Sequence, residues 1–239
     1  MTMAILQRWP LTATRDTIVY PESDGKPMAE SDLHREIMVW IIQLLQRFFA
    51  GQQVYVSGNL LIYYEKGNPR KSVAPDCFVV WDVEPRLRLT YKLWEEGQAP
   101  LVVFEVTSRS TRREDMKDKM RLYAQLGVEE YYLYDPTGDY LKPSLAAFQR
   151  AGDGFVPMQP DNGEMRLGDL TFLPAEGESP EYVSPRLGLR LALDEQNRLQ
   201  FYSVASGQRL LSDFEISQQF EAENARLRAE LARLLGELA

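Results

Sequence analysis

Two carboxylates stand out because each lies in a short, otherwise apolar segment. Asp76 begins the segment at residues 75–82, and Glu105 lies late in the segment at residues 101–108. A carboxylate in an apolar strand is costly to bury unless a cation, a proton or a metal compensates its charge. Two such acids on neighbouring strands would form a site of oxygen ligands suited to Mg²⁺. The pattern therefore predicts a hard-cation site built from Asp76 and Glu105.

A lysine on the next predicted helix faces the same way. With Met116 set at 0° and about 100° per residue, Lys119 falls at about 300°, close to Tyr123 and Leu126. Lys117 falls at about 100°, near the edge of the apolar arc. We therefore expect Lys119 to point towards the sheet and Lys117 towards water. An inward ammonium needs a carboxylate partner, and Glu105 is the natural one because it lies in the segment leading into this helix.

Hydrophobic periodicity indicates which elements position these residues. The nearly continuous apolar run at 101–106 indicates a central strand that is buried on both faces. Loops are expected over 83–98 and 174–186. Helices are expected over 32–50 and 112–126, strands over 54–64, 75–82, 101–106 and 130–134, and hairpins from 144–149 with 154–158 and from 187–193 with 199–202.

The expected fold is α/β (α+β): a mixed central sheet flanked by the two helices, with extra β-hairpins and a C-terminal helix. The expected division is a domain over 1–212 and a C-terminal amphipathic helix over 213–239.

The C-terminal segment has a heptad-like pattern. Its repeating positions follow a 4-3-4-3-4 spacing: Phe220, Asn224, Leu227, Leu231, Leu234 and Leu238. Asn224 would occupy an a position, where one polar residue can specify a dimer, and Glu223 and Arg228 would occupy g and e positions. Two readings stay open: a short coiled coil between chains, or a helix that lies on its own domain.

Composition limits the possible function classes. The net charge is −8, and the balance is −2 over residues 1–136 and −6 over the remainder, which leaves room for a small cationic groove in the first part. The only histidine is His34, which excludes His-rich zinc sites; a packing role in the first turn of a helix is expected for it. The only cysteine, Cys77, excludes an internal disulfide and suits the cytoplasm. No membrane helix or signal peptide is expected.

The ordered set of motifs resembles the Uma-type restriction endonuclease family of the PD-(D/E)xK superfamily, over roughly residues 15 to 215. In the ordinary pattern a lysine lies two residues after the glutamate, where this chain has Thr107. In this family the lysine is displaced to the following helix, and Lys119 matches that position. Arg109 stands where the family often has proline. The matching residues are Pro75-Asp76, Glu105-Val106-Thr107-Ser108, Ser110-Thr111, Asp115, Lys119, Tyr123, Glu130-Tyr131 and Asp135-Pro136.

The resemblance implies a restriction-endonuclease-like fold and phosphodiester hydrolysis. Asp76 and Glu105, with the backbone carbonyl of Val106, would hold Mg²⁺, for which Mn²⁺ could substitute, and Lys119 would act on the water or the phosphate. Further residues implied by the resemblance are Arg109, Arg112 and Arg113 as phosphate contacts, and Glu36, Asp115 and Tyr123 near the site. The expected protein is therefore a cytoplasmic endodeoxyribonuclease that binds DNA and makes no membrane contact. A homodimer is expected because two sites can address the two strands of a duplex.

Two other function classes stay open at this point. An inactive nuclease-fold scaffold would use its acidic surface and terminal helix to bind proteins, which the net charge favours and the complete Asp76, Glu105 and Lys119 set disfavours. A Cys-His hydrolase would use Cys77, but the apolar residues that follow it predict a buried and unreactive thiol.

Overall fold

A six-stranded mixed sheet forms the centre of the computed structural model, which describes residues 18–23, 25, 31–108, 115–162 and 179–237. The strand order is β1-β4-β6-β7-β8-β9. Only β6 and β7 run parallel, and the other neighbours pair antiparallel. The strands are β1 (Val54–Ser57), β4 (Cys77–Trp81), β6 (Val102–Val106), β7 (Glu130–Tyr134), β8 (Leu145–Ala151) and β9 (Gly154–Pro157). The expected central position of the 101–106 strand is therefore confirmed.

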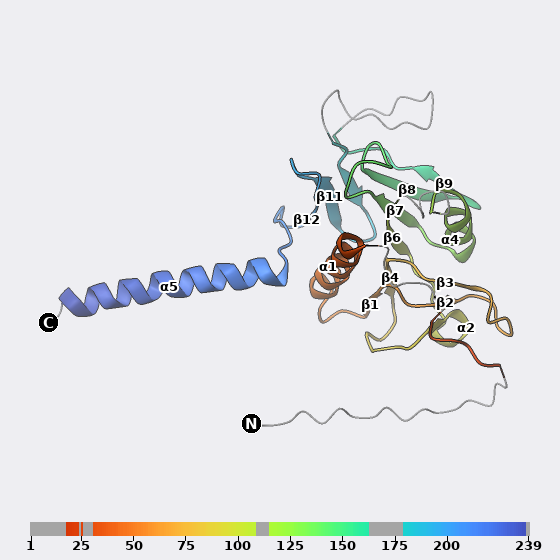
Figure 1. Ribbon diagram of the computed structural model, residues 1–239, viewed down its shortest axis with the longest axis horizontal. Coiled ribbons are helices and arrows are strands. Elements are labelled where there is room, and N and C mark those ends of the chain that lie inside the picture. The colour runs from red at the N-terminus through yellow and green to blue at the C-terminus, as the bar shows by residue number, and fades with distance from the viewer. Residues whose placement is uncertain (1–17, 24, 26–30, 109–114, 163–178, 238–239) are drawn as a thin grey trace.

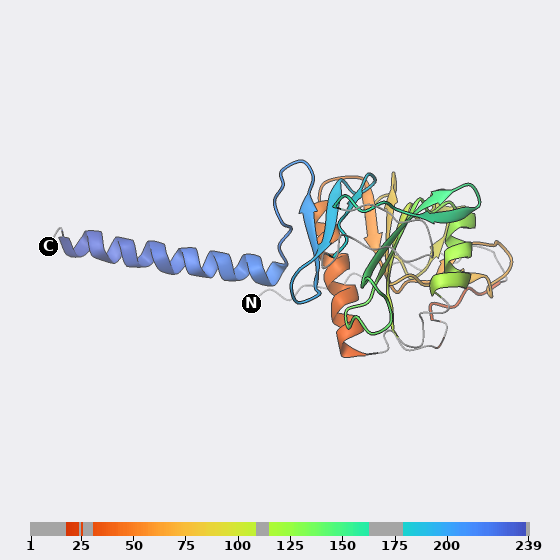
Figure 2. The ribbon, with the colours of Figure 1, turned by 90° about the horizontal axis from the view of Figure 1, so that it is seen from above.

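Each face of the central sheet is covered by its own layer (Figures 1 and 2). One face packs against helix α1 (Asp32–Phe48) and a three-stranded sheet of β10 (Tyr182–Ser184), β11 (Leu189–Leu193) and β12 (Leu199–Ser203). The residues of α1 that repeat at helical spacing supply this contact, and Ser31 accepts a hydrogen bond from the N–H of His34 to begin the helix.

The opposite face packs against shorter elements. These are helix α4 (Met120–Leu126) and a three-stranded sheet in the order β3-β2-β5. The members of that sheet are β2 (Ile62–Tyr63), β3 (Ser72–Val73) and β5 (Tyr91–Lys92), and the short helix α2 (Leu93–Glu96) follows it. Helix α4 is preceded directly by a π-helical segment, η1 (Asp115–Lys119). The expected architecture of a mixed sheet between helices, with extra hairpins, is confirmed.

One expected strand, two expected loops and one expected helix differ from the structure. The single strand expected over 54–64 is wrong, because the chain leaves the central sheet after Ser57 and enters the β3-β2-β5 sheet at Ile62; Asn59 lies between them with a left-handed φ of 47°. The loops expected over 83–98 and 174–186 are wrong in part, because they contain β5 with α2, and β10. The helix expected over 112–126 is π-helical at 115–119, and residues 112–114 lie outside the described residues.

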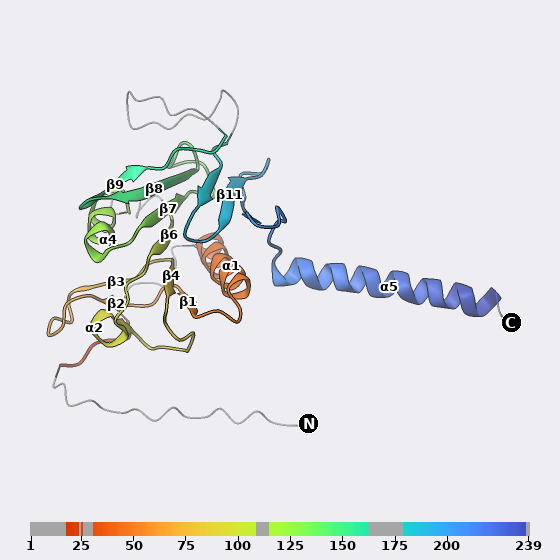
Figure 3. The same cartoon turned by 180° about the vertical axis from the view of Figure 1, so that it is seen from behind.

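The C-terminal helix α5 (Asp213–Glu237) extends away from the rest of the protein, beginning beside the β11–β12 hairpin (Figures 1 and 3). This arrangement contradicts the reading in which the helix lies on its own domain. Among the described residues, no helix combines the length and the apolar character that crossing a bilayer requires.

Candidate active site

Asp76 and Glu105 lie opposite each other at one end of β4 and β6. The antiparallel register pairs Cys77 with Phe104, so Asp76 and Glu105 are the next opposing positions beyond that pair. Directly opposed residues have Cβ atoms about 4.5–5.5 Å apart. The N–H of Val106 donates to Oδ2 of Asp76 at 2.7 Å, which fastens the residue before β4 to the end of β6. Asp76 and Glu105 therefore occupy opposing positions on neighbouring strands.

Glu105 is buried and held by two donors from the η1–α4 segment. Its side chain is only 1% exposed. Nζ of Lys119 lies 2.9 Å from Oε2, and the hydroxyl of Tyr123 donates to Oε1 at 2.6 Å. Burial, reinforced by the charge of Glu105, raises the pKa of Tyr123, so the phenol stays protonated and donates. The expected inward Lys119 is present, and Lys117 is exposed as expected.

A side chain from α1, His34, contacts Asp76, and the sequence alone does not predict this contact. Nε2 of His34 lies 3.0 Å from Oδ2 of Asp76, an ion-pair distance without the alignment of a hydrogen bond. His34 is buried in the first turn of α1, as expected, whereas Glu36 is exposed two residues further on. Two residues turn the helix by about 200°, so one helix cannot direct both side chains to the site. The tentative assignment of Glu36 therefore does not fit this geometry, and His34 is the α1 residue that contacts Asp76.

A close approach of two backbones sets the position of Asp76. A Cβ added to Gly58 would lie 1.9 Å from the carbonyl oxygen of Asp76, far inside van der Waals contact. The N–H of Asn59 donates to the carbonyl of Pro75 at 2.7 Å. The chain after β1 thus rests directly on the residues before β4. This requirement for glycine was not recognised in the sequence, although a glycine within an apparent strand is a known signal of close backbone approach.

A family model and one solved structure are similar to this chain. Residues 6–175 match the model of the Uma2 family, described as "Putative restriction endonuclease". The chain belongs to the Uma2 family. A search of curated proteins found no match. Among solved structures, the chain is similar to "a putative nuclease belonging to DUF820 from Anabaena variabilis", with 14% identity, a TM-score of 0.39, and coverage of 64% of this chain and 85% of that one. Membership of Uma2 places the protein among nucleases in general terms.

The donor set of this Uma2 protein fits Mg²⁺. Among the described residues, no group of three or more His, Cys, Asp or Glu side chains gathers as a metal cluster. Mg²⁺ does not need one, because it keeps several waters and is commonly bound through one or two carboxylates. Thr107 adds a further observation: it is 3% exposed, and its hydroxyl has no hydrogen-bond partner in the described structure. A buried hydroxyl two residues after Glu105 suits a contact with a metal-bound water.

The structure does not describe all the residues that the Uma2 resemblance assigns to the site. Arg109, Arg112 and Arg113 lie outside the described residues, as does the side chain of Asp115. Val106 contacts Asp76 through its N–H, and its carbonyl remains the predicted metal ligand.

The Cys-His hydrolase reading is contradicted by the surroundings of Cys77. The thiol is fully buried in the core, and burial, with the charges of Asp76 and Glu105, raises its pKa, which leaves a poor nucleophile.

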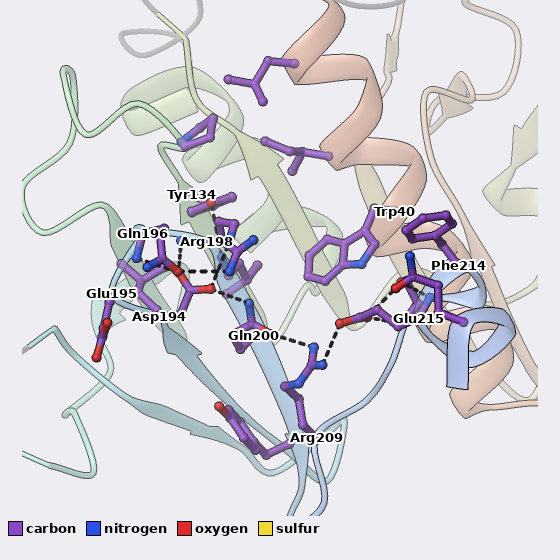
Figure 4. Close-up of a pocket in the computed structure, with 18 residues that line it drawn as sticks. Trp40, Tyr134, Asp194, Glu195, Gln196, Arg198, Gln200, Arg209, Phe214 and Glu215 are labelled. Carbon is purple, nitrogen blue, oxygen red and sulfur yellow. Dashed lines mark hydrogen bonds and ion pairs between the residues drawn. The ribbon is translucent and has the colours of Figure 1, made fainter. Parts of the chain in front are cut away.

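A surface cavity of about 980 Å³ lies away from this site, between α1, the β11–β12 hairpin and the start of α5 (Figure 4). Four of its charged groups form two ion pairs. Arg198 contacts Asp194 at 2.8 Å, and Arg209 contacts both Gln200 at 3.1 Å and Glu215 at 2.6 Å. These internal pairs connect the hairpin to the first turn of α5, so we assign the cavity a structural role at the base of that helix.

Proposed function

We propose that this protein is a Mg²⁺-dependent endonuclease that hydrolyses phosphodiester bonds in DNA and acts as a homodimer in the cytoplasm. The observation that supports the proposal is the placement of three residues: Asp76 lies opposite Glu105 across β4 and β6, and Lys119 contacts Glu105. Membership of a family described as restriction endonucleases supports the choice of substrate. Mn²⁺ is expected to replace Mg²⁺, since it accepts the same oxygen ligands.

Asp76 and Glu105 would hold the ion, with the carbonyl of Val106 as a further ligand. When bound, the ion supplies polarisation of the scissile phosphate and a lower pKa for a bound water. Tyr123 fixes the orientation of the Glu105 carboxylate through its 2.6 Å hydrogen bond. Val106 and His34 both contact Oδ2 of the Asp76 carboxylate. The chain thus orients both acids before any ligand arrives.

Lys119 has two tasks in this proposal. It neutralises the buried Glu105, and its ammonium, on a side chain that is 15% exposed, would stabilise charge that develops on the phosphate. Arg109, Arg112 and Arg113 follow Glu105 in the sequence and would contact the flanking phosphates. Such contacts position the nucleic acid and do not read its sequence.

The decisive experiment measures nicking of supercoiled plasmid during a titration with Mg²⁺, with a single-stranded RNA substrate in parallel. The variants are Asp76→Asn and Lys119→Met, and Lys117→Met is the matched control because Lys117 is exposed on the same segment. We expect about 100-fold or greater loss in the first two variants and none in the control. Binding of Mn²⁺, followed by paramagnetic resonance, should weaken in Asp76→Asn whether or not the protein cuts.

An inactive scaffold is the second candidate, and the net charge of −8 favours it. Equal nicking by the wild type and both site variants would identify contamination. Together with absent Mn²⁺ binding, that result would replace the nuclease proposal with the scaffold. Cleavage of RNA but not of DNA would correct only the substrate.

A further inference from the structure

Residues 212–215, called here the root of α5, contact the rest of the domain. These contacts set the direction of the helix. Ser212 and Glu215 form a capping box: the hydroxyl of Ser212 accepts from the N–H of Glu215 at 3.2 Å, and the carboxylate of Glu215 accepts from the N–H of Ser212 at 2.7 Å. Asp213 forms an ion pair with Arg47 of α1, and Glu215 contacts Arg209. Beyond this root the helix extends away from the domain (Figures 1 and 2).

The extended part of α5 carries an apolar stripe that its own domain leaves uncovered. Phe220, Leu227 and Leu231 are 67%, 48% and 59% exposed. Their spacing, with Asn224 between them, repeats the a and d positions of a heptad. The sequence continues the pattern at Leu234, whose side chain lies outside the described residues. A helix of this kind gains most of its stability from packing of its apolar face.

We propose that α5 binds α5 of a second copy of this chain as a parallel, in-register, two-stranded coiled coil. In this arrangement Asn224 at an a position faces Asn224 of the other copy, and the two amides can hydrogen-bond each other. An antiparallel pair would place Asn224 against an apolar d position, where its amide would be buried without a partner. The polar residue therefore selects both the partner and the direction.

Charge complementarity supports the same pairing. Glu223 occupies a g position and Arg228 the e position five residues later, which are the positions that meet across a parallel dimer. Within its own helix Glu223 makes only a long contact of 3.8 Å with Arg226, and Arg228 has no ion pair in the described part of the chain. The two reciprocal Glu223–Arg228 pairs would flank the Asn224 layer. The pairing deepens the homodimer of the proposed function and rests on that part of it, whereas it does not depend on nuclease activity, because no active-site residue takes part.

Sedimentation equilibrium of the full chain tests the association. The double variant Leu227→Glu with Leu231→Glu places charges in the stripe. The matched control, Ala222→Glu with Ala229→Glu, adds the same charges at exposed f positions of the same helix. We expect a dimer for the wild type and the control. The stripe variant should raise the dissociation constant by about 100-fold or more. A monomeric wild type, or equal weakening by both double variants, would overturn the proposal.

The direction is tested by disulfide formation and by charge reversal. Ser217→Cys introduces a thiol at an a position near the root, where parallel chains bring the two Cα atoms within disulfide range. Ala222→Cys places the thiol outside the interface as a control. We expect rapid cross-linking only for Ser217→Cys. Dimers that fail to cross-link there would refute the parallel arrangement.

The charge reversal measures the flanking ion pairs directly. Glu223→Arg should weaken the dimer about twofold to fivefold, because it sets two cations against each other in each pair. Adding Arg228→Glu should restore the affinity, since each pair again joins opposite charges. Failure of the second substitution to restore affinity would refute the predicted register.

Discussion

Removal of the Lys119 ammonium should destabilise the protein before any substrate is added. In Lys119→Ala the carboxylate of Glu105, 1% exposed, would lose the cation that lies 2.9 Å away. Breaking a buried pair on one side costs about 3–5 kcal/mol, because a buried charge is left without compensation. We expect the low end, about 3 kcal/mol, since Tyr123 still donates to the other oxygen and Lys119 is partly exposed. This corresponds to a fall of about 100-fold in the folding equilibrium constant.

Urea denaturation with EDTA and with Mg²⁺ measures this cost. Lys117→Ala is the matched control and should stay within about 0.5 kcal/mol of wild type, because its side chain is exposed. Mg²⁺ at about 100 times its dissociation constant would add about 2.7 kcal/mol, so the metal should restore most of the stability of Lys119→Ala. Nicking should stay at least about 100-fold low even in Mg²⁺. Two results would refute this reasoning. One is a Lys119→Ala variant that is as stable as Lys117→Ala in EDTA, and the other is a Lys119→Ala variant that nicks at the wild-type rate.

Three further predictions follow from other contacts. Tyr123→Phe should cost about 1–3 kcal/mol in urea unfolding and raise the Mg²⁺ concentration needed for nicking, because Glu105 loses its second donor. Gly58→Ala should cost about 1–3 kcal/mol, since its Cβ would meet a backbone carbonyl at 1.9 Å, whereas Gly154→Ala, with nothing within 4 Å, should be nearly neutral. Burial raises the pKa of Glu130, so the folded state binds a proton on this carboxylate more tightly than the unfolded state does. The contribution of Glu130 to stability should therefore be greatest below its ordinary pKa and fall as pH rises through the raised one, and Glu130→Gln should remove that slope from urea titrations; an unchanged slope would contradict it.

Burial patterns made the centre of the fold predictable. The strand expected at 130–134 coincides with β7, and the strand at 101–106 differs from β6 by one residue. Both are largely apolar runs bounded by turn residues, each with one glutamate, and such runs are a clear sequence signal for buried strands. The inward direction of Lys119 was predictable for the same reason, because its position on the helix follows from the apolar residues beside it.

The remaining features depend on tertiary contacts that no local pattern carries. Residues 54–64 read as one strand, but the chain changes sheets at Gly58 and Asn59, where it rests against the backbone before β4. His34 was assigned to packing because a single histidine carries no motif, and its contact with Asp76 joins residues 42 positions apart. The π-helical segment before α4 was not predictable either, because a π turn has no distinct sequence signature.

The π-helical segment that ends at Lys119 has a consequence for how relatives can be recognised. A π turn hydrogen-bonds to the fifth residue along instead of the fourth, so a helix can absorb one extra residue without turning the rest of its surface. The gap between the glutamate and its helical lysine can therefore change by one residue among relatives while the two side chains still meet. A search pattern with a fixed gap would reject such relatives. A tolerant gap, combined with a check that the lysine lies on the buried side, would retain them.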